Sequence, residues 1–359
     1  MKVAVLWTAL SGYMNACLQE LASHSGVELL VSHMRPTQDA PFDESGFAWM
    51  PRRFMWKSPA DIGPLVPVLR SFDPDVIVVV GWHVPAYRQL AHEYAGRSWR
   101  VMTMDNPWRG TLKQWAGVLT APLYLRPIAD AVWLPGERQA QFARKLGFME
   151  SQILRGLYSC NQPAFEAQHW KRVRDGKPVP HAFLFAGRLV PPKGIEILAR
   201  AYRLYHEQAA DPWPLVCCGA GPLRPLLEGQ PGVRVEGFVQ PEAMTEKLAA
   251  TGCFILPSIF EPWALVIHEA ASAGLVILAS ETVGAAVHLV QPGFNGFIFD
   301  DRDVQGLAHL MMRVSTLSST RLDEMSRASN LLSRQFTPAR WANTLIEAHA
   351  ARNHIGQCG

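Results

Sequence analysis

Several features that would each indicate a particular class of protein are scarce or absent in this sequence. No apolar run approaches the roughly 18 residues that a membrane-spanning helix requires, so any membrane role would be peripheral. The six cysteines form no Cys-x-x-Cys pair, which favours reduced core thiols of a cytoplasmic protein over a disulfide framework or a zinc site. The net charge is only +3, too small for a nucleic-acid-binding surface, so we expect no nucleic-acid partner.

Two short motifs of cofactor-binding and metal-binding enzymes are also missing. Gly219 and Gly221 follow an apolar strand, as in a dinucleotide-binding fingerprint, but Pro222 and the lack of a third glycine break that pattern. A dehydrogenase is therefore disfavoured. No Asp-x-Asp pair at a strand end offers metal ligands. We expect neither a bound metal nor a cofactor.

The length and the order of predicted elements indicate two domains. A chain of 359 residues is long for a single hydrophobic core. Apolar strands alternate with helical segments over residues 2–154, a second alternation begins near residue 181, and the polar stretch 159–180 between them is typical of a linker. The sequence predicts an α/β protein with two Rossmann-like domains facing a cleft, over 1–165 and 180–336, and a C-terminal helix in 337–359 that packs back on the N-terminal domain.

Two glutamates lie at a short predicted helix of the C-terminal half. Pro262 and Gly274 favour a helix over residues 263–273, so that Glu261 stands at its start and Glu269 lies inside it, roughly 12 Å further along the axis. The free N–H groups of a first helical turn bind anions, and carboxylates accept hydrogen bonds from sugar hydroxyls. The pattern predicts a nucleotide-sugar site with one glutamate at the sugar, the other at the ribose, and the diphosphate on the amides of Ala264, Leu265 and Val266.

These glutamates also have a purely structural interpretation. Acids are common in the first turn of a helix because they complement its dipole, and Glu269 could be a solvated surface residue. Yet Glu269 lies in a helix with almost no polar face, and an acid in such surroundings needs a partner. A bound ligand would supply that partner.

A second phosphate contact is predicted after the apolar strand 181–186. Arg188 and Lys193 flank a loop stiffened by two prolines, just before a helix that begins at residue 195. Cations in these positions can neutralise a diphosphate as negative charge develops on it.

Three residues of the N-terminal half follow predicted strands directly. Residues beyond the carboxyl ends of parallel strands face the ligand crevice, so we expect Gly12 near the donor, His83 on the acceptor side, and Asp105 orienting or deprotonating an acceptor hydroxyl. Each has a structural alternative. One glycine suits any tight turn, a lone histidine is more often structural, and Asp105 suits the cap of the following helix equally well.

The stretch 52–57 interleaves basic and aromatic side chains, a composition that suits a membrane interface or a glycan acceptor. We favour the simpler interpretation, a solvated loop whose aromatic side chains are tucked into the core.

Two segments resemble the signatures of a known family. EPWALVIHEA (261–270) and GRLVPPKG (187–194) are similar to the motifs of the family 4 retaining glycosyltransferases, glycosyl transferases group 1, which have the GT-B architecture. The resemblance covers most of the C-terminal half. It implies that Arg188 and Lys193 bind the donor phosphates, and that Glu261 and Glu269 hold the donor.

The same resemblance implies two further donor contacts and includes two departures. Members of the family wrap the backbone of the segment that contains Gly237 around the base, and their loop at Gly12 faces the donor diphosphate. Ala264 replaces the usual glycine, which adds a methyl group close to the expected diphosphate. Asp105 stands where a histidine is frequent.

The resemblance implies a metal-independent, hexosyltransferase-like enzyme that moves a sugar, with retention, from a nucleotide diphosphate sugar to a glycan or glycolipid hydroxyl. Bacterial surface polysaccharide or glycolipid synthesis would be its setting. The alternatives are a nucleotide-sugar epimerase of the same architecture and a non-catalytic nucleotide-sugar-binding partner. We expect a cytoplasmic protein whose N-terminal domain contacts the inner face of the membrane peripherally.

Overall fold

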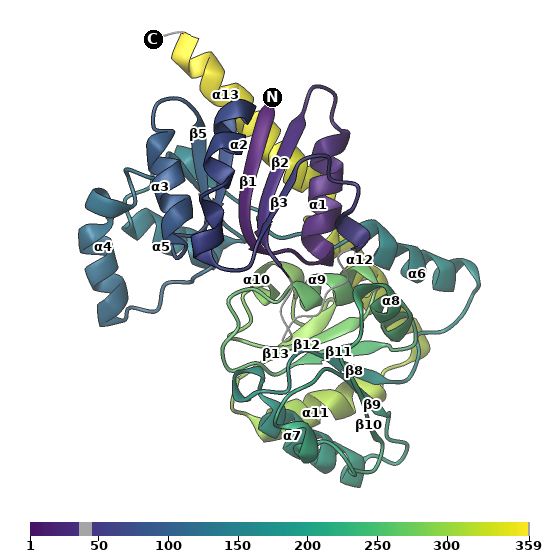
Figure 1. The fold of residues 1–359 in the computed structure, drawn as a ribbon. Coiled ribbons are helices and arrows are strands. Elements are labelled where there is room, and N and C mark those ends of the chain that lie inside the picture. The colour runs from purple at the N-terminus through teal and green to yellow at the C-terminus, as the bar shows by residue number, and fades with distance from the viewer. Residues whose placement is uncertain (36–44, 358–359) are drawn as a thin grey trace. The chain divides into compact units, whose positions relative to one another are not determined.

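The computed structural model describes residues 1–35 and 45–357, and it describes their side chains except at residues 59 and 354–357. The chain divides into two compact units. Unit 1 comprises Met1–Ser159 together with Pro338–Gly359, and unit 2 comprises Cys160–Thr337. Each contains one parallel β-sheet with flanking helices (Figure 1). None of the described helices combines the length and the apolar character that crossing a bilayer demands.

Unit 1 contains a seven-stranded sheet in the order β3-β2-β1-β4-β5-β6-β7. The strand order reverses between β1 and β4, so the loops after these two strands flank the crevice in which α/β sheets bind ligands. Its strands are β1 Lys2–Ala9, β2 Glu28–Met34, β3 Arg53–Trp56, β4 Val76–Val80, β5 Trp99–Thr103, β6 Ala131–Trp133 and β7 Ile153–Leu154. Its helices are α1 Gly12–Ser23, α2 Leu65–Phe72, α3 Pro85–Glu93, α4 Leu112–Tyr124, α5 Glu137–Lys145 and α13 Pro338–Gln357.

The alternation of side chains along the strands of unit 1 builds a core on each face of the sheet. Val3 and Val5 of β1 pack with α1 and α13, whereas Ala4 and Leu6 face the core that α2, α3 and α5 cover. Because both faces are buried, the strands are apolar without interruption. This explains why their positions could be predicted from apolar runs alone.

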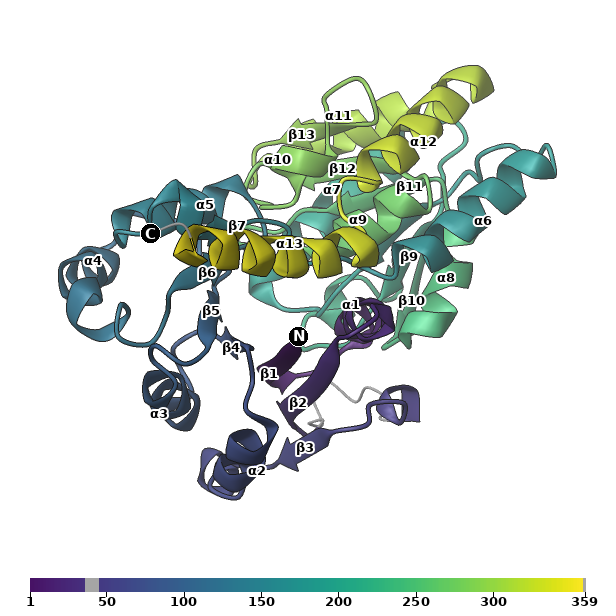
Figure 2. The same cartoon turned by 90° about the horizontal axis from the view of Figure 1, so that it is seen from above.

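The last helix, α13, completes the first of these cores, and Figure 2 shows it lying along the sheet of unit 1. The indole ring of Trp341 stacks on that of Trp133, with ring centroids 4.6 Å apart. Its Nε1 donates a hydrogen bond of 2.8 Å to the carbonyl of Leu157. Trp341 is therefore a core residue of unit 1, although about 180 residues of chain separate it from the rest of that unit.

Unit 2 contains a six-stranded sheet in the order β10-β9-β8-β11-β12-β13, which reverses between β8 and β11. Helix α7 packs beside α11, and α6 and α12 both contact α9. The strands are β8 Phe183–Ala186, β9 Leu215–Cys218, β10 Val233–Gly237, β11 Cys253–Leu256, β12 Val276–Ser280 and β13 Gly296–Phe299. The helices are α6 Gln162–Arg174, α7 Ile195–Gln208, α8 Pro241–Ala249, α9 Leu265–Ser272, α10 Ala286–Leu289, α11 Val304–Ser315 and α12 Ser319–Ser333.

The stretch 159–180 is not the interdomain linker that its polar composition indicated, because almost all of it belongs to unit 2. It contains α6, and the first segment of unit 1 ends at Ser159, before that helix begins. Phe165 and His169 of α6 are buried, and the helix contacts α8 and α9. One apolar stripe is enough to hold a helix on a domain, even where most of its residues are polar.

Five of the six cysteines are buried and free, as expected for core thiols, and Cys358 lies outside the described residues.

Candidate nucleotide-sugar site

The predicted donor residues of unit 2 gather at the carboxyl end of its sheet. The loop after β8 carries Arg188 and Lys193, and the loop after β11 carries Glu261. These two strands are neighbours at the point where the strand order reverses. Their loops therefore flank the place where open α/β sheets hold their ligands.

Lys193 and Glu261 form an ion pair with each other. The Lys193 ammonium donates to a carboxylate oxygen of Glu261, and the two side chains are only 19% and 12% exposed. The hydroxyl of Ser258 donates to the same oxygen over 3.4 Å. A cation and an anion expected to contact one ligand are thus already adjacent, each neutralising the other's charge at a largely buried position.

Arg188 differs from Lys193 in its surroundings. Its side chain is exposed, and within the described parts of the chain no carboxylate forms an ion pair with it. It lies two residues beyond the end of β8. An exposed guanidinium on the same loop as Lys193 thus adds a positive charge that no described carboxylate compensates.

The helix that carries Glu269 begins later than predicted. The expected span was 263–273, whereas α9 spans Leu265–Ser272. Ala264 has φ 77° and ψ 81°, a left-handed conformation that interrupts the helix before Leu265. The preceding residues are tied to another loop, since Gly284 N donates to Glu261 O and Ala285 N donates to Trp263 O. The expected separation of 12 Å between the two glutamates assumed that the helix begins at Glu261. Because α9 begins only at Leu265, that distance is no longer expected.

The amides of Leu265 and Val266 belong to the first turn of α9, whose N–H groups have no acceptor within the helix. The free N–H groups of these two residues can still bind a diphosphate at this end of the helix, as predicted. Ala264 now lies at the cap, in the conformation that the usual glycine adopts without strain.

Glu269 occupies the second turn of α9 and is mostly buried. Its neighbours Ile267, Ala270 and Ala271 are buried apolar residues. Burial raises the pKa of Glu269 from 4.5 to about 7. The carboxyl group thus changes its charge near neutral pH, in the position predicted to accept hydrogen bonds from ribose hydroxyls.

Glycines allow the backbones of the loops around this site to approach one another closely. A methyl group on Gly194 would lie 1.8 Å from the carbonyl oxygen of Pro257, and one on Gly284 would lie 1.9 Å from that of Pro262. Gly219 approaches the carbonyl of Gly187 equally closely, and Gly221 approaches that of Leu189. The Gly-x-Gly after β9 is therefore explained by contact with the Arg188 loop. No dinucleotide is needed to account for it.

Gly237 terminates β10 with φ 76°, and its carbonyl accepts a hydrogen bond of 2.6 Å from Gly219 N. It is thereby connected to the same group of loops through Gly219.

Unit 1 contains a cavity of 560 Å³ at the carboxyl ends of β1, β4 and β5. His83 and Asp105 both line it, as the crevice rule predicted for residues beyond adjacent parallel strands. Gly12 is the first residue of α1, and the neighbouring Tyr13 lines the cavity. Two residues predicted separately from the ends of β4 and β5 therefore line one hollow, and Gly12 is adjacent in sequence to a third lining residue.

Asp105 is not a helix cap. Helix α4 begins at Leu112, and its cap is Thr111, whose hydroxyl accepts a hydrogen bond of 3.3 Å from Gln114 N. Asp105 instead accepts a hydrogen bond of 3.3 Å from the hydroxyl of Tyr158. Burial raises the pKa of Tyr158 well above its usual value, so its phenol remains protonated and can donate.

Tyr13 and Tyr158 were missed by sequence reasoning. Their rings meet edge to face with centroids 5.6 Å apart, and both line the cavity. Tyr158 is 53 residues away from Asp105 in sequence, so no local motif indicates their contact. The position of Tyr13 after the β1 turn was the one available signal.

The basic and aromatic stretch 52–57 is partly built into the core of unit 1. Residues 53–56 are the edge strand β3, and the indole of Trp56 is buried and donates a hydrogen bond of 2.7 Å to the hydroxyl of Tyr87. Arg52 pairs with Glu28. The favoured interpretation is confirmed in that Trp56 is tucked into the core, but the expected loop is wrong, because residues 53–56 form a strand that pairs with β2.

A comparison with family models matches residues 180–316 to glycosyl transferases group 1. A crystal structure of the Anabaena protein HepE in complex with UDP aligns over 98% of this chain and 100% of its own, with a TM-score of 0.74 and 18% identity. The fold is GT-B. The predicted α/β architecture of two Rossmann-like domains is thereby confirmed, while the GT-B fold alone identifies no activity.

Curated relatives align with parts of this GT-B chain. An uncharacterized glycosyltransferase of Methanocaldococcus jannaschii is 34% identical over 121 residues, which is 32% of this chain and 30% of the relative. A sulfoquinovosyl transferase of Arabidopsis thaliana is 29% identical over 150 residues, 40% of this chain and 28% of the relative. The chain spans less than a third of the length of these relatives.

Proposed function

We propose that this protein is a retaining glycosyltransferase that moves a sugar from a nucleotide diphosphate sugar to an acceptor hydroxyl without a metal ion. The observation that carries the proposal is the Lys193–Glu261 ion pair at the reversal of strand order, beside the exposed Arg188 and the first turn of α9. The cations and the free amides suit the diphosphate of a nucleotide sugar, and the acid suits its sugar hydroxyls.

In this mechanism the bond between the anomeric carbon and the diphosphate oxygen breaks, a bond between the same carbon and the acceptor oxygen forms, and negative charge grows on the departing diphosphate. Arg188, Lys193 and the first-turn amides of α9 stabilise that charge. Lys193 must turn from Glu261 toward the phosphate, or share its three N–H groups between the two. The released Glu261 carboxylate then accepts hydrogen bonds from hydroxyls of the donor sugar.

Glu269 holds the ribose in this proposal. An ionised carboxylate accepts hydrogen bonds from both ribose hydroxyls, whereas a protonated one accepts fewer. With a pKa of about 7, the free site is partly protonated at neutral pH. Hydroxyl donors from the ribose favour the charged form and lower that pKa when the donor binds.

We assign the acceptor to the cavity of unit 1. Asp105 can take the proton of an acceptor hydroxyl, the Tyr158 phenol holds the Asp105 carboxylate in place, and His83 lines the same hollow. The cavity also has the 300–1,000 Å³ or so that is typical of small-molecule sites. A sugar or a lipid headgroup with free hydroxyls is the acceptor class that it suits.

The comparisons support a uridine nucleotide in the donor and a sugar as the transferred group. HepE binds UDP, and one curated relative is a sulfoquinovosyl transferase. By analogy we propose that the product belongs to surface polysaccharide or glycolipid synthesis, with a hexose as the transferred sugar.

The test is nucleotide release from a panel of uridine, guanosine and adenosine diphosphate sugars, with a mixed glycan and lipid acceptor extract. We expect one donor to be used, and Arg188→Ala to lower turnover roughly a hundredfold or more while donor affinity changes little. Wild-type turnover in this variant would contradict the assignment. Release of an epimerised sugar without acceptor would instead indicate an epimerase, and tight binding without release a binding partner.

The same assay with a chelator tests metal independence, and we expect unchanged release. A metal site would have candidate ligands in three acids, Glu281, Asp300 and Asp301. Their carboxylate oxygens lie within 4.8 Å of one another. Loss of activity on chelation, restored by magnesium and abolished in Glu281→Gln, would assign a metal to these residues and overturn the metal-independent mechanism.

A further inference from the structure

Helix α4 turns its most apolar face away from unit 1. Helices on a globular domain normally bury that face and present charged residues to water. In α4 the half-buried or buried positions are Gln114, Gly117, Val118, Ala121 and Tyr124, which share one face. The opposite face carries three leucines and a tryptophan: Leu112, Leu119 and Leu123 are 88%, 79% and 81% exposed, and Trp115 is 50% exposed.

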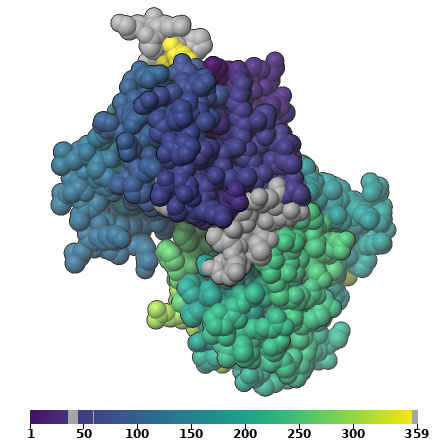
Figure 3. Space-filling view, in the orientation of Figure 1, coloured from purple at the N-terminus to yellow at the C-terminus, as the bar shows by residue number. Residues whose placement is uncertain are grey.

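These four side chains form one continuous stripe, which we call the α4 stripe. At about 100° per residue they fall, with Ala116 and Pro122, within an arc of about 120° on the helix surface. The three leucines are also the most exposed large apolar side chains in the described parts of the chain. Figure 3 shows α4 and its surroundings, in blue, projecting at the left of unit 1. A contiguous apolar stripe of this kind marks an interaction surface.

The charge around the α4 stripe has one sign. Residues 106–129 contain Arg109, Lys113 and Arg126 and no acidic residue. The ammonium of Lys145 lies 4.9 Å and 5.5 Å from the ring centroids of Trp108 and Trp115, and Trp108 meets Trp115 edge to face. Aromatic rings and cations beside exposed leucines are the composition of a helix that lies in the headgroup region of a bilayer.

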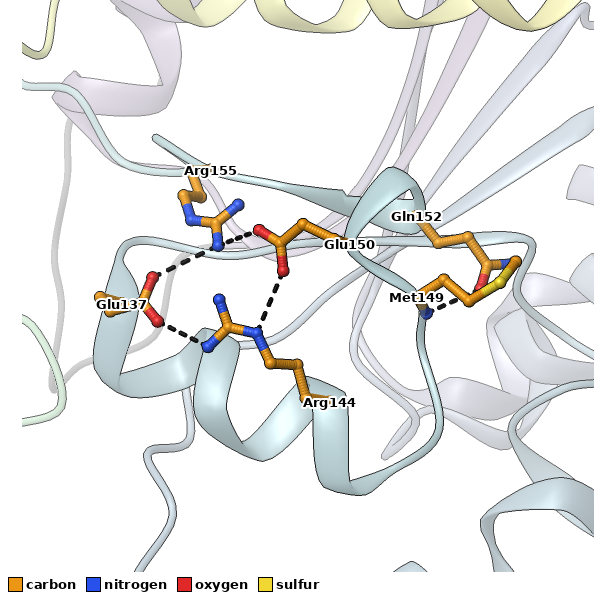
Figure 4. A network of polar contacts seen from close by, with 6 residues as sticks. All are labelled: Glu137, Arg144, Met149, Glu150, Gln152 and Arg155. Atoms are coloured by element: carbon orange, nitrogen blue, oxygen red, sulfur yellow. Dashed lines mark hydrogen bonds and ion pairs between the residues drawn. The ribbon is translucent and has the colours of Figure 1, made fainter. Parts of the chain in front are cut away.

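The ion-pair network at α5 shows which cations remain available. Glu137 and Glu150 pair with both Arg144 and Arg155, so these four charges cancel (Figure 4). No carboxylate of the described residues forms an ion pair with Lys113 or Lys145. The net positive charge of this region therefore lies next to the α4 stripe and not at the network.

We propose that the α4 stripe docks this protein on an anionic lipid bilayer, with the leucines among the acyl chains and Lys113 and Lys145 at the lipid phosphates. A second copy of the chain fits less well. Two facing α4 helices would bring like charges together, and residues 106–129 offer no acid to pair with them. An anionic bilayer supplies both the apolar phase and the opposite charge.

The docking surface adjoins the cavity of unit 1. Lys113, Gln114, Gly117 and Tyr124 of α4 line that cavity, while the stripe occupies the other side of the helix. A lipid headgroup beside the docked helix would thus be close to the cavity that holds His83 and Asp105. This extension to the acceptor rests on the proposed function, whereas the docking itself does not.

The experiment is co-sedimentation of the full chain with vesicles of phosphatidylcholine, with or without phosphatidylglycerol. We expect binding to the mixed vesicles and weaker binding to the neutral ones or at high salt. The double substitution Leu119→Ser with Leu123→Ser should lower the partition coefficient tenfold or more, since two inserted side chains are lost. The matched control is Val287→Ser with Leu331→Ser, which removes two side chains that are 50% and 58% exposed in unit 2 and should leave binding unchanged.

Charge is tested by Lys113→Gln with Lys145→Gln, which should abolish the preference for phosphatidylglycerol. Failure of the wild-type protein to bind either vesicle, or equal loss in the α4 and control variants, would overturn the proposal. So would a dimer in light scattering that the leucine substitutions convert to a monomer, because a second copy would then cover the stripe. None of these outcomes depends on sugar transfer, so failure of docking and failure of the proposed reaction are distinguishable.

Discussion

At the scale of single residues, Glu261 and Glu269 have different surroundings and should respond differently to removal of their charge. Glu261 pairs with Lys193 before α9 begins, whereas Glu269 lies in an apolar part of that helix and forms no ion pair with any described residue. One acid is thus compensated by the protein itself. The other is held in surroundings that oppose its charge, which is a frequent property of functional acids.

We predict that nucleotide diphosphate alone binds more weakly to Glu269→Gln, by roughly tenfold or more at pH 8, because hydrogen bonds to an ionised acceptor are lost at the ribose. Glu261→Gln should bind it as well as wild type or better, since Lys193 is then released for the phosphates. Isothermal titration calorimetry measures both. At pH 5.5, where free Glu269 is mostly protonated, the defect of Glu269→Gln should shrink. Equal losses in the two variants would show that the glutamates do not divide the donor between them.

The same residue predicts a pH dependence of stability. The pKa of Glu269 is raised from 4.5 to about 7 in the folded state, so the folded protein binds this proton more tightly than the unfolded chain does. The free energy of unfolding therefore falls as pH rises from about 4.5 to 7, and the loss is complete above pH 7.

Glu269→Gln removes this ionisation. Relative to wild type, it should be more stable at pH 8 than at pH 5, by a difference on the order of 3 kcal/mol. Urea unfolding at the two pH values gives the measurement, and Glu196→Gln on the exposed side of α7 serves as the control. A stability difference that does not vary with pH would mean that Glu269 is solvated.

Sequence reasoning identified the residue types of the site better than their contacts. Arg188, Lys193 and Glu261 were predicted because their motifs are short and local. The Lys193–Glu261 contact depends on β8 and β11 being neighbours, which the order of strands in a sheet decides and the spacing of residues does not. Tyr158 reaches Asp105 through the same kind of long-range arrangement.

At the scale of elements, the start of α9 and the loops around it depend on backbone approach. The proline at 262 suggested a helix from 263, but the left-handed Ala264 and the hydrogen bonds to residues 284 and 285 delay it. Propensity rules describe one segment at a time, so they could not include a neighbouring loop that competes for the same backbone groups.

The glycine contacts supply an element-scale prediction with a matched control. Gly194 and Gly176 have similar left-handed φ values of 69° and 62°, but only Gly194 has a backbone carbonyl in the way of a methyl group. Gly176→Ala should lower the free energy of unfolding by about 1 kcal/mol, the strain of an alanine in this conformation. Gly194→Ala should lower it by about 3 kcal/mol or more, because the Lys193 and Pro257 loops must also separate.

Urea unfolding compares these two variants, and turnover provides a second measurement. Gly194→Ala should also reduce turnover, since the displaced loop carries Lys193. Equal effects of the two substitutions on stability would mean that the two loops are not in close contact.

At the scale of the whole molecule, unit 1 depends on a helix from the far end of the chain. Trp341→Ala removes a stacked, hydrogen-bonded core side chain and should lower the stability of unit 1 by about 3–5 kcal/mol. Hydrogen exchange of the full chain should become faster in peptides from residues 1–159 and remain unchanged in those from 180–330. The control is Trp170→Ala, which removes a side chain of unit 2 that is 41% exposed. It should leave the hydrogen exchange of unit 1 unchanged. Exchange that rises equally in both units would show that they unfold together.

Because unit 1 is built from two separate segments of the chain, its parts become available to fold at different times during protein synthesis. When the ribosome has produced residue 159, every strand of the first sheet exists, but the face around Trp133 lacks its covering helix. Roughly 180 more residues must be made before Trp341 emerges, a delay on the order of 10–40 s at cellular translation rates. Unit 2 is continuous and has its whole sequence by residue 337. The second domain can therefore finish folding first, while the nascent first domain waits with an open apolar face on which chaperones can act.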